Sequence, residues 1–298
     1  MRLLRLKTVL AATDLLPSSD AAVASAARLA DAAGAKLHIA HVAPERAQTG
    51  ASDSSDDASA SIASTLERIG ISRTNHRVHV LSGDPPTALS ALADQIRTDV
   101  IVVGRHRPRA GGESNGSVGG TAYGVMTQSL APCLITSQPL HVPVLRTVVA
   151  IDTSETARGA LLVALSWSSA LRQPKSEGPG TTLIALHVAS GRPLSEEAAE
   201  RKRIVDHELS VLKRGAGSWA GVSVEGVTET DDDPVTAIIR FAQHHDADLL
   251  VLGTRGLSAK NLPGLGSVSE AVTRQLETPV LLVPPAVWRN HAHEIDYF

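Results

Sequence analysis

Two short stretches decide the fold of this chain: Asp99-Val100-Ile101-Val102-Val103-Gly104 and Asp248-Leu249-Leu250-Val251-Leu252-Gly253. Each is a continuous apolar run without polar alternation, which is typical of a strand buried on both faces of a parallel sheet. Each also follows an Asp-Pro pair at the same distance, because 20 residues separate Asp84 from Gly104 and Asp233 from Gly253. An aspartate before a proline is a favourable start for a helix. Both halves of the chain are therefore predicted to contain a helix followed by a buried strand.

The repeat extends on both sides of these stretches. Residues 9–14 match 147–152, residues 39–42 match 185–188, and residues 131–135 match 278–282. Residues 18–33 and 154–172 are rich in alanine and leucine and are predicted to be helices. Each half reads as five strands alternating with four helices. We therefore predict an α/β fold with two tandem doubly wound five-stranded parallel sheets and helices on both faces.

The length of 298 residues agrees with two domains, since a domain usually has about 150 residues. We place the first domain at residues 1–140 and the second at residues 144–286, and we take residues 287–298 as a C-terminal tail. Residues 48–61 are rich in serine and aspartate. They are predicted to form a solvated loop before the second helix.

Composition and charge exclude several classes of protein. The chain has 28 Lys and Arg against 31 Asp and Glu, a net charge of −3, and only three Trp, two Tyr and two Phe. Without a basic excess or an aromatic stacking platform, nucleic acid is not an expected partner. No apolar run approaches the roughly 18 residues of a membrane span, so no membrane contact is expected. The single cysteine, Cys133, cannot form an internal disulfide, which favours a cytoplasmic location.

A spaced set of glycines follows the second buried strand. Its skeleton is Gly253, two residues, Gly256, nine residues and then Gly266-Ser267, where the next helix is predicted to begin. In doubly wound folds, ligands bind beyond the carboxyl ends of the strands, where Asp152 also lies. Glycines let the backbone approach a ligand and adopt positive φ, helix N-terminal amides hold phosphate, and Arg255 adds a positive charge. The alternative is that these glycines only shape a surface loop.

Together these residues resemble the universal stress protein family. The spacing of Gly253, Gly256 and Gly266-Ser267 is similar to the motif of the family's ATP-binding branch, and the segments ending in Asp152 and His187-Val188 are similar to its other landmarks. The resemblance covers essentially the whole chain as two copies. It implies the fold of the adenine-nucleotide alpha hydrolases in each copy. It also implies that the copies pair through their last strands as an internal pseudo-dimer, with further homodimerisation left open.

The resemblance further implies that the second copy binds ATP, with or without Mg²⁺. Asp152 would face the ribose or adenine, and Val188 would meet the base through its backbone. The remaining residues of the implied site are Gly253, Arg255 and Gly256 around the ribose and phosphates, and Gly266, Ser267 and Val268 on the phosphates. The resemblance assigns no catalytic residue and no metal site.

The first copy departs from this pattern. Arg107 occupies the position of Gly256, and 15 residues separate Gly104 from Gly119, against 13 from Gly253 to Gly266. A degenerate site there would comprise Asp14, Val42, Gly104, Gly119, Gly120 and Thr121. We therefore expect one ATP per chain, bound in the second copy. The arginines at positions 105, 107 and 109 either attract another anion or are simply solvated.

Other constellations explain less. Residues 112–116 match Gly-x-Ser-x-Gly, but their serine follows Gly104 by ten residues, whereas a hydrolase nucleophile directly follows a strand. His38 and His41 differ by three positions in a predicted strand and so point to opposite faces. The acidic and histidine side chains between His291 and Asp296 would make a poor metal cage in a terminal tail.

Three hypotheses of function remain. The first is an ATP-binding regulatory module of a stress response. The second is a slow ATP hydrolase that uses the same pocket, which is disfavoured because no general base or Mg²⁺-holding carboxylate lies beside the glycines. The third is a nucleotide-free scaffold. ATP binding separates the first two from the third, and hydrolysis separates the second from the first.

Overall fold

The computed structural model describes residues 4–43, 53–71, 76–105, 119–172, 180–189, 196–215, 221–256 and 264–291. The chain divides into two compact units. The first unit is Leu6–His141, and the second is Val142–Phe298 together with the amino-terminal residues up to Arg5. The backbone amide of Leu4 donates a hydrogen bond of 3.0 Å to Ser166 Oγ, which ties the amino terminus to the second unit.

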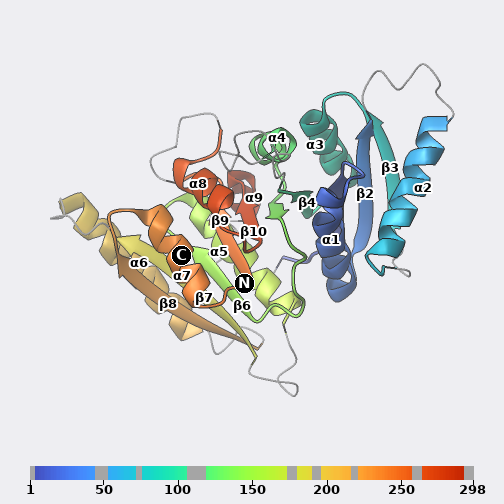
Figure 1. The fold of residues 1–298 in the computed structure, drawn as a ribbon. Helices are drawn as coiled ribbons and strands as arrows, with labels where there is room; N and C mark the ends of the chain where they lie inside the picture. The colour runs from blue at the N-terminus through green and yellow to red at the C-terminus, as the bar shows by residue number, and fades with distance from the viewer. Residues whose placement is uncertain are drawn as a thin grey trace. The chain divides into compact units, whose positions relative to one another are not determined.

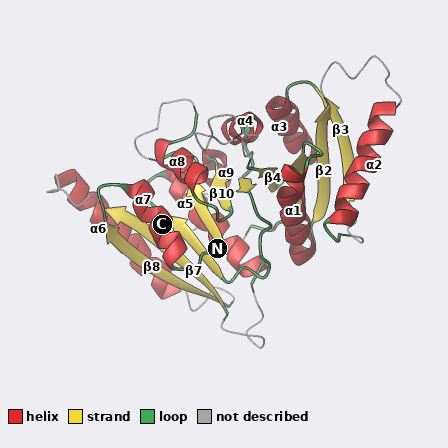
Figure 2. Cartoon of the chain, viewed as in Figure 1, coloured by secondary structure: helices red, strands yellow, loops and turns green. Residues whose placement is uncertain are grey.

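The first unit contains five strands and four α-helices among its described residues (Figures 1 and 2). In chain order they are β1 (Thr8–Thr13), a 3-10 turn (Pro17–Ser19), α1 (Asp20–Ala33), β2 (Lys36–Ala43), α2 (Asp53–Arg68), β3 (His76–Ser82), α3 (Pro85–Ile96), β4 (Val100–Gly104), α4 (Gly120–Gln128) and β5 (Cys133–Thr136). The strands lie in the order β3-β2-β1-β4-β5. All their pairings are parallel.

The second unit repeats this arrangement and ends in one more helix (Figure 1). Its elements are β6 (Arg146–Ala150), α5 (Glu155–Ala170), β7 (Thr181–Ala189), α6 (Glu196–Gly215), β8 (Val222–Thr230), α7 (Pro234–His244), β9 (Leu249–Gly253), α8 (Ser267–Gln275), β10 (Val280–Val283) and α9 (Pro285–His291). The strands lie in the order β8-β7-β6-β9-β10, again with parallel pairings. The predicted fold class is confirmed.

The strand order explains why helices cover both faces of each sheet. From β6 the chain moves outward through β7 to β8, and then returns to β9 and moves the other way to β10. Since crossovers between parallel strands are right-handed, the helices of the two directions lie on opposite faces. β4 and β9 are therefore enclosed, and the residues Val100–Val102 and Leu249–Val251 are fully buried.

The helix starts predicted from the Asp-Pro pairs are correct. The side chain of Asp84 accepts a hydrogen bond from Thr87 N at 3.2 Å at the start of α3. Asp233 accepts one from Val235 N at 3.0 Å at the start of α7. The hydrogen bond from the Thr236 hydroxyl is the main reason that the pKa of Asp233 lies below its usual value. The carboxylate of Asp233 therefore serves as the N-cap of α7.

The prediction of a solvated loop over residues 48–61 is wrong from Asp53 onward, because α2 begins there. Ala58, Ile62 and Leu66 are buried, with exposed fractions of 6%, 1% and 3%. They recur every four residues and so form one apolar stripe on a helix. This stripe outweighs the polar composition, which we read as a loop signal.

Residues 287–291, which the sequence analysis placed in a C-terminal tail, belong to α9 of the second unit. The helix packs on α5, where Gly159 leaves room for Trp288: a Cβ at position 159 would lie 3.4 Å from Trp288 Cβ. The guanidinium of Arg158 lies 5.9 Å from the centre of the Trp288 ring and is 2.7 Å from Glu208.

Candidate functional site

A cavity of about 700 Å³ opens at the carboxyl ends of β6 and β9 in the second unit. These two neighbouring strands are the point at which the chain changes direction across the sheet, where doubly wound folds bind their ligands. The structure brings all eight residues singled out in the second half to its lining: Asp152, Val188, Gly253, Arg255, Gly256, Gly266, Ser267 and Val268. The volume falls within the range of small-molecule sites.

Asp152 follows β6 and is held in place by the backbone. Its Oδ1 accepts a hydrogen bond of 2.8 Å from Ser154 N, which closes a tight turn into α5. The ring of His187 supports the same corner, because its Nδ1 lies 3.1 Å from the carbonyl oxygen of Ile151. A carbonyl can only accept a hydrogen bond, so Nδ1 is the protonated ring nitrogen. The His-Val segment therefore positions the residue that precedes Asp152.

The glycines serve close approach and not unusual backbone angles, which corrects part of the sequence argument. Positive φ is absent from Gly253, Gly256 and Gly266, whereas Gly264 has a φ of 108°. A Cβ on Gly256 would lie 3.0 Å from Asp152 Oδ2, and a Cβ on Gly253 would lie 2.8 Å from Thr156 Cβ. Because Gly256 does not use positive φ, backbone strain gives no reason to disfavour an arginine at the matching position of the first unit. At position 256 itself the reason for a glycine is steric, because a Cβ would press on Asp152 Oδ2.

The amino end of α8 faces the cavity without a side-chain cap. Gly266 is the N-cap, with φ −67° and ψ 145°, and its own amide donates a hydrogen bond of 2.8 Å to Thr254 O. The first amides of a helix have no carbonyl acceptors within the helix, and a glycine cap offers no side chain to them. Such an end attracts anions, above all phosphate.

Arg255 links the two described ends of the glycine segment, which runs from Gly253 to Gly266. Its Nε donates a hydrogen bond of 3.0 Å to Gly264 O. Its guanidinium is thus both a positive charge at the cavity and a fixed part of the loop. The other side of the cavity is apolar, with Leu186, Pro234 and Ile238 among its lining residues. One side suits a flat apolar ring, and the other suits an anion.

A sequence profile described as "Universal stress protein family" matches residues 5–137 and again residues 144–284. The chain belongs to the universal stress protein family. It carries the family's domain twice in tandem.

Three similar proteins illustrate how much of the chain has known relatives. A universal stress protein from Thermus aquaticus, named from the 3′ region of its QAH/OAS sulfhydrylase gene, is 31% identical over 142 residues, which cover 46% of this chain and 96% of the relative. A universal stress protein structure from Archaeoglobus fulgidus shares 21% identity and a TM-score of 0.66, covering 94% of this chain and 97% of that one. A universal stress protein solved in complex with cAMP is 27% identical, with a TM-score of 0.36, covering 44% of this chain and 96% of that one.

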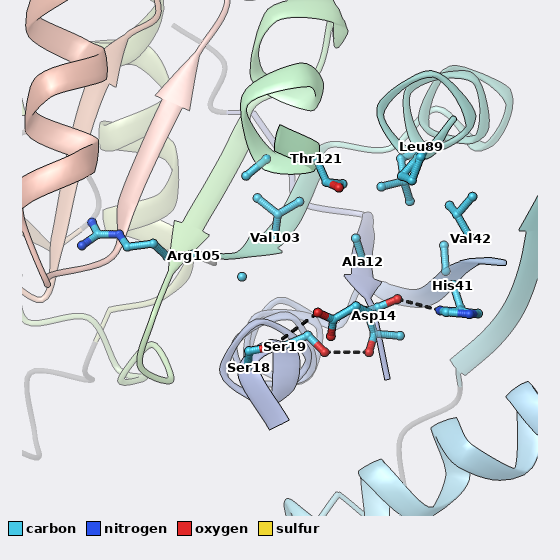
Figure 3. A pocket seen from close by; sticks show the side chains of 15 residues that line it. Ala12, Asp14, Ser18, Ser19, His41, Val42, Leu89, Val103, Arg105 and Thr121 are labelled. Carbon is cyan, nitrogen blue, oxygen red and sulfur yellow. Dashed lines mark hydrogen bonds between the residues drawn. The ribbon is translucent and has the colours of Figure 1, made fainter. Parts of the chain in front are cut away.

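The first universal stress protein domain keeps a smaller cavity, of about 330 Å³, at the carboxyl ends of β1 and β4 (Figure 3). Asp14, Val42, Gly104 and Thr121 line it. Gly119 and Gly120 are the N-cap and first residue of α4, and the φ of −56° and ψ of 148° at Gly119 resemble the angles at Gly266. The frame of the site is therefore present in both domains.

The polar side chains at the first cavity are arranged differently from those at the second. The Ser18 hydroxyl donates a hydrogen bond of 3.3 Å to Asp14 Oδ2. The side chain of Arg105 is directed away from Asp14 (Figure 3). Arg107, Arg109 and the Gly-x-Ser-x-Gly stretch at 112–116 lie outside the described residues.

The sequence analysis missed a histidine pair in the first domain. His38 on β2 and His79 on β3 are stacked, with ring centres 5.1 Å apart, and His38 Nδ1 lies 2.8 Å from His79 Nε2. His41, on the opposite face, has its Nδ1 3.0 Å from Thr13 O, as His187 has with Ile151 O. The spacing of three residues gave the opposite faces, but the partner strand could not be paired from the sequence.

Neither a metal centre nor a membrane span emerges from the described part of the chain. There, no three His, Cys, Asp or Glu side chains gather in a group that could hold a metal ion. Its helices are too short or too polar to cross a membrane. The histidine and acidic residues at 293, 294 and 296 lie outside the described residues.

Proposed function

We propose that the second domain binds ATP in the cavity between β6 and β9, and that the protein acts as a nucleotide-binding regulatory module of a stress response. One observation carries this proposal: the Asp152 carboxylate and the uncapped amino end of α8 line the same cavity. A carboxylate accepts hydrogen bonds from sugar hydroxyls, whereas a helix amino end binds phosphate. A nucleotide carries both groups.

The shape of the backbone supports a phosphate at this position. A Cβ on Gly266 would lie 3.4 Å from Arg255 Cα and Thr254 O, in ordinary van der Waals contact, and a branched side chain would add bulk next to the amino end of α8. Glycine keeps that space open. A Mg²⁺ ion would enter with the nucleotide, because it is bound mainly through phosphate oxygens and water when few carboxylates are present.

The test is Gly266→Val, with Gly119→Val as the matched control in the first domain. The φ of −67° and ψ of 145° at Gly266 are open to valine, so the variant should fold. We expect it to lose ATP binding in isothermal titration calorimetry. The titration also compares ATP with AMP and cAMP, which measures how much the extra phosphates contribute.

The stoichiometry decides between the two domains. We expect about one ATP per chain for the parent and for Gly119→Val. Unchanged affinity in Gly266→Val would remove the helix end from the site. Two equivalent ATP molecules per chain, or loss of binding only in Gly119→Val, would contradict the assignment to the second domain.

A further inference from the structure

Thr156 joins helix α5 to the glycine segment of the second domain. It lies in the first turn of α5 and only 5% of it is exposed. Its hydroxyl donates a hydrogen bond to the carbonyl oxygen of Arg255. Its Cβ and hydroxyl also lie against Gly253, where a Cβ would come within 2.8 Å and 2.9 Å of them. The residue therefore fixes a loop carbonyl and fills the space beside a loop glycine.

The direction of the hydrogen bonds follows from counting protons. A threonine hydroxyl has one proton, and Thr156 gives it to Arg255 O, which can only accept. The contact of 3.0 Å between Ser154 Oγ and Thr156 Oγ1 must then have Ser154 as its donor. Ser154 Oγ in turn accepts the amide of Ala157 at 3.2 Å. The result is a directed chain of hydrogen bonds from the cap of α5 to the glycine segment, in which each bond polarises the next.

The carbonyl oxygen that Thr156 binds belongs to Arg255, whose side chain also bonds to the other end of the glycine segment. Arg255 donates through Nε to Gly264 O at 3.0 Å, and the neighbouring Thr254 O accepts the amide of Gly266 at 2.8 Å. From the other side, Ser269 Oγ donates to Gly253 O at 2.6 Å. The turn at 253–256 is thus anchored to two helix starts. Thr156 supplies the anchor on α5, and Ser269 supplies the anchor on α8.

In the first domain, the described residues show a different hydrogen bond at the matching position; His106, which matches Arg255, lies outside them. The residue that corresponds to Thr156, four positions after the strand-end aspartate, is Ser18, and its single proton goes to Asp14 Oδ2. The position that corresponds to Ser154 is Leu16, which has no hydroxyl to orient a neighbour. The hydroxyl at this place in the repeat therefore donates to the strand-end aspartate in the first domain and to the carbonyl oxygen of Arg255 in the second.

We propose that Thr156 is a positioning residue for the nucleotide site: its hydroxyl, oriented by Ser154, holds Arg255 so that the turn at 253–256 stays aligned with the amino end of α8. The proposal rests on the proposed function of this site. Nothing in the spacing of the glycines requires it, because Thr156 lies about 100 residues before them in the chain. Its effect is to organise the phosphate side before the ligand arrives, which lowers the cost of binding.

The experiment compares the parent with Thr156→Val and Thr156→Ser, and uses Ser18→Ala as the matched control in the first domain. Valine keeps the branched Cβ beside Gly253 but removes the hydroxyl, whereas serine keeps the hydroxyl. Amide hydrogen exchange of the ligand-free proteins is measured in peptides that cover 249–256 and 264–275. ATP affinity is measured by calorimetry. If Thr156→Val does not fold, Thr156→Ala replaces it.

We expect Thr156→Val to exchange faster in both peptides and to bind ATP about tenfold more weakly, because the partly buried carbonyl of Arg255 loses its donor. Thr156→Ser and Ser18→Ala should match the parent. Unchanged exchange in Thr156→Val, or an equal loss in Thr156→Ser, would overturn the role of the hydroxyl. If the parent itself binds no ATP, the proposed function is wrong, and the exchange data still decide whether Thr156 orders the loop.

Discussion

Replacing Gly256 by alanine is expected to weaken nucleotide binding while leaving stability nearly unchanged. The added Cβ would lie 3.0 Å from Asp152 Oδ2, and, apart from the residues adjacent in the chain, no other described atom lies within 4 Å of it. The carboxylate must therefore shift by a few tenths of an ångström. Its other oxygen is bound to Ser154 N at 2.8 Å, so the shift strains the turn that aims Asp152 into the cavity.

The expected magnitude follows from what the displaced carboxylate would lose. A hydrogen bond to a charged group contributes about 1.5–3 kcal/mol, and about 1.4 kcal/mol corresponds to a tenfold change in affinity. Since the carboxylate is displaced and not removed, we expect ATP to bind about tenfold more weakly to Gly256→Ala. The free energy of unfolding should change by less than about 1 kcal/mol, because a single flexible side chain has to move.

Gly253→Ala is the contrasting variant. Its Cβ would come within 3.0 Å of three atoms of Thr156, including the backbone carbonyl carbon. The start of α5 has to move, so this variant should lose about 1–3 kcal/mol of stability as well as ATP affinity.

The assays are calorimetry with ATP and urea unfolding followed by tryptophan fluorescence. All three tryptophans lie beyond residue 142 in the sequence, within the range of the second unit, so the fluorescence reports that unit. Parent-like affinity in Gly256→Ala, measured beside Asp152→Ala that has lost binding, would refute the steric reasoning. Parent-like affinity in both variants would remove Asp152 from the site.

Two further predictions concern charge. Arg255→Ala should weaken ATP binding more at low than at high ionic strength, because Coulomb attraction is lost. Arg255→Lys should restore only that salt-dependent part of the affinity, since lysine lacks the Nε–H that binds Gly264 O. Calorimetry at two salt concentrations checks this, and full recovery of the affinity by lysine would contradict it. The pKa values of His38 and His79 are both lowered from 6.5, chiefly by burial. Neighbouring positive groups lower them further: His79, Arg77 and Lys36 act on His38, and Arg77 acts on His79. Below pH 6.5 the unfolded state therefore binds more protons than the folded one, and the first unit should lose stability as the pH falls from 7 to 5. Labelling of Cys133 in urea measures this, because burial raises the pKa of that thiol to about 12 and protects it while the unit is folded; an equally steep pH dependence in His79→Gln would show that the pair is not the cause.

The repeat predicted the architecture because the chemistry of strands and caps is local. The apolar runs at 99–104 and 248–253 need only their own residues to be identified as buried strands, and the Asp-Pro pairs need only the next three residues to cap a helix. The same holds for the eight residues of the second cavity, which lie at strand and helix ends that the repeat already located. The start of α2 was missed because composition was weighed above the stripe of Ala58, Ile62 and Leu66.

The contacts that the sequence could not supply are those between segments far apart in the chain. The pair of His38 and His79 depends on the register of β2 with β3, in which Ala40 lies opposite His79. The bond from Thr156 to Arg255 depends on how the start of α5 meets the end of β9. Likewise, a glycine signals either positive φ or close approach, and only the neighbouring atoms showed that Gly253 and Gly256 serve close approach.

The comparison of the two domains shows which features the fold needs and which the site needs. Both domains keep the strand-end aspartate, the histidine bonded to the preceding carbonyl, and a glycine N-cap with nearly the same backbone angles, at Gly119 and Gly266. They differ where a hydroxyl points: Ser18 turns to Asp14, whereas Thr156 turns to the glycine segment. The glycine spacing of the second domain, which Arg107 and two extra residues interrupt in the first, is therefore the reason to expect one nucleotide per chain.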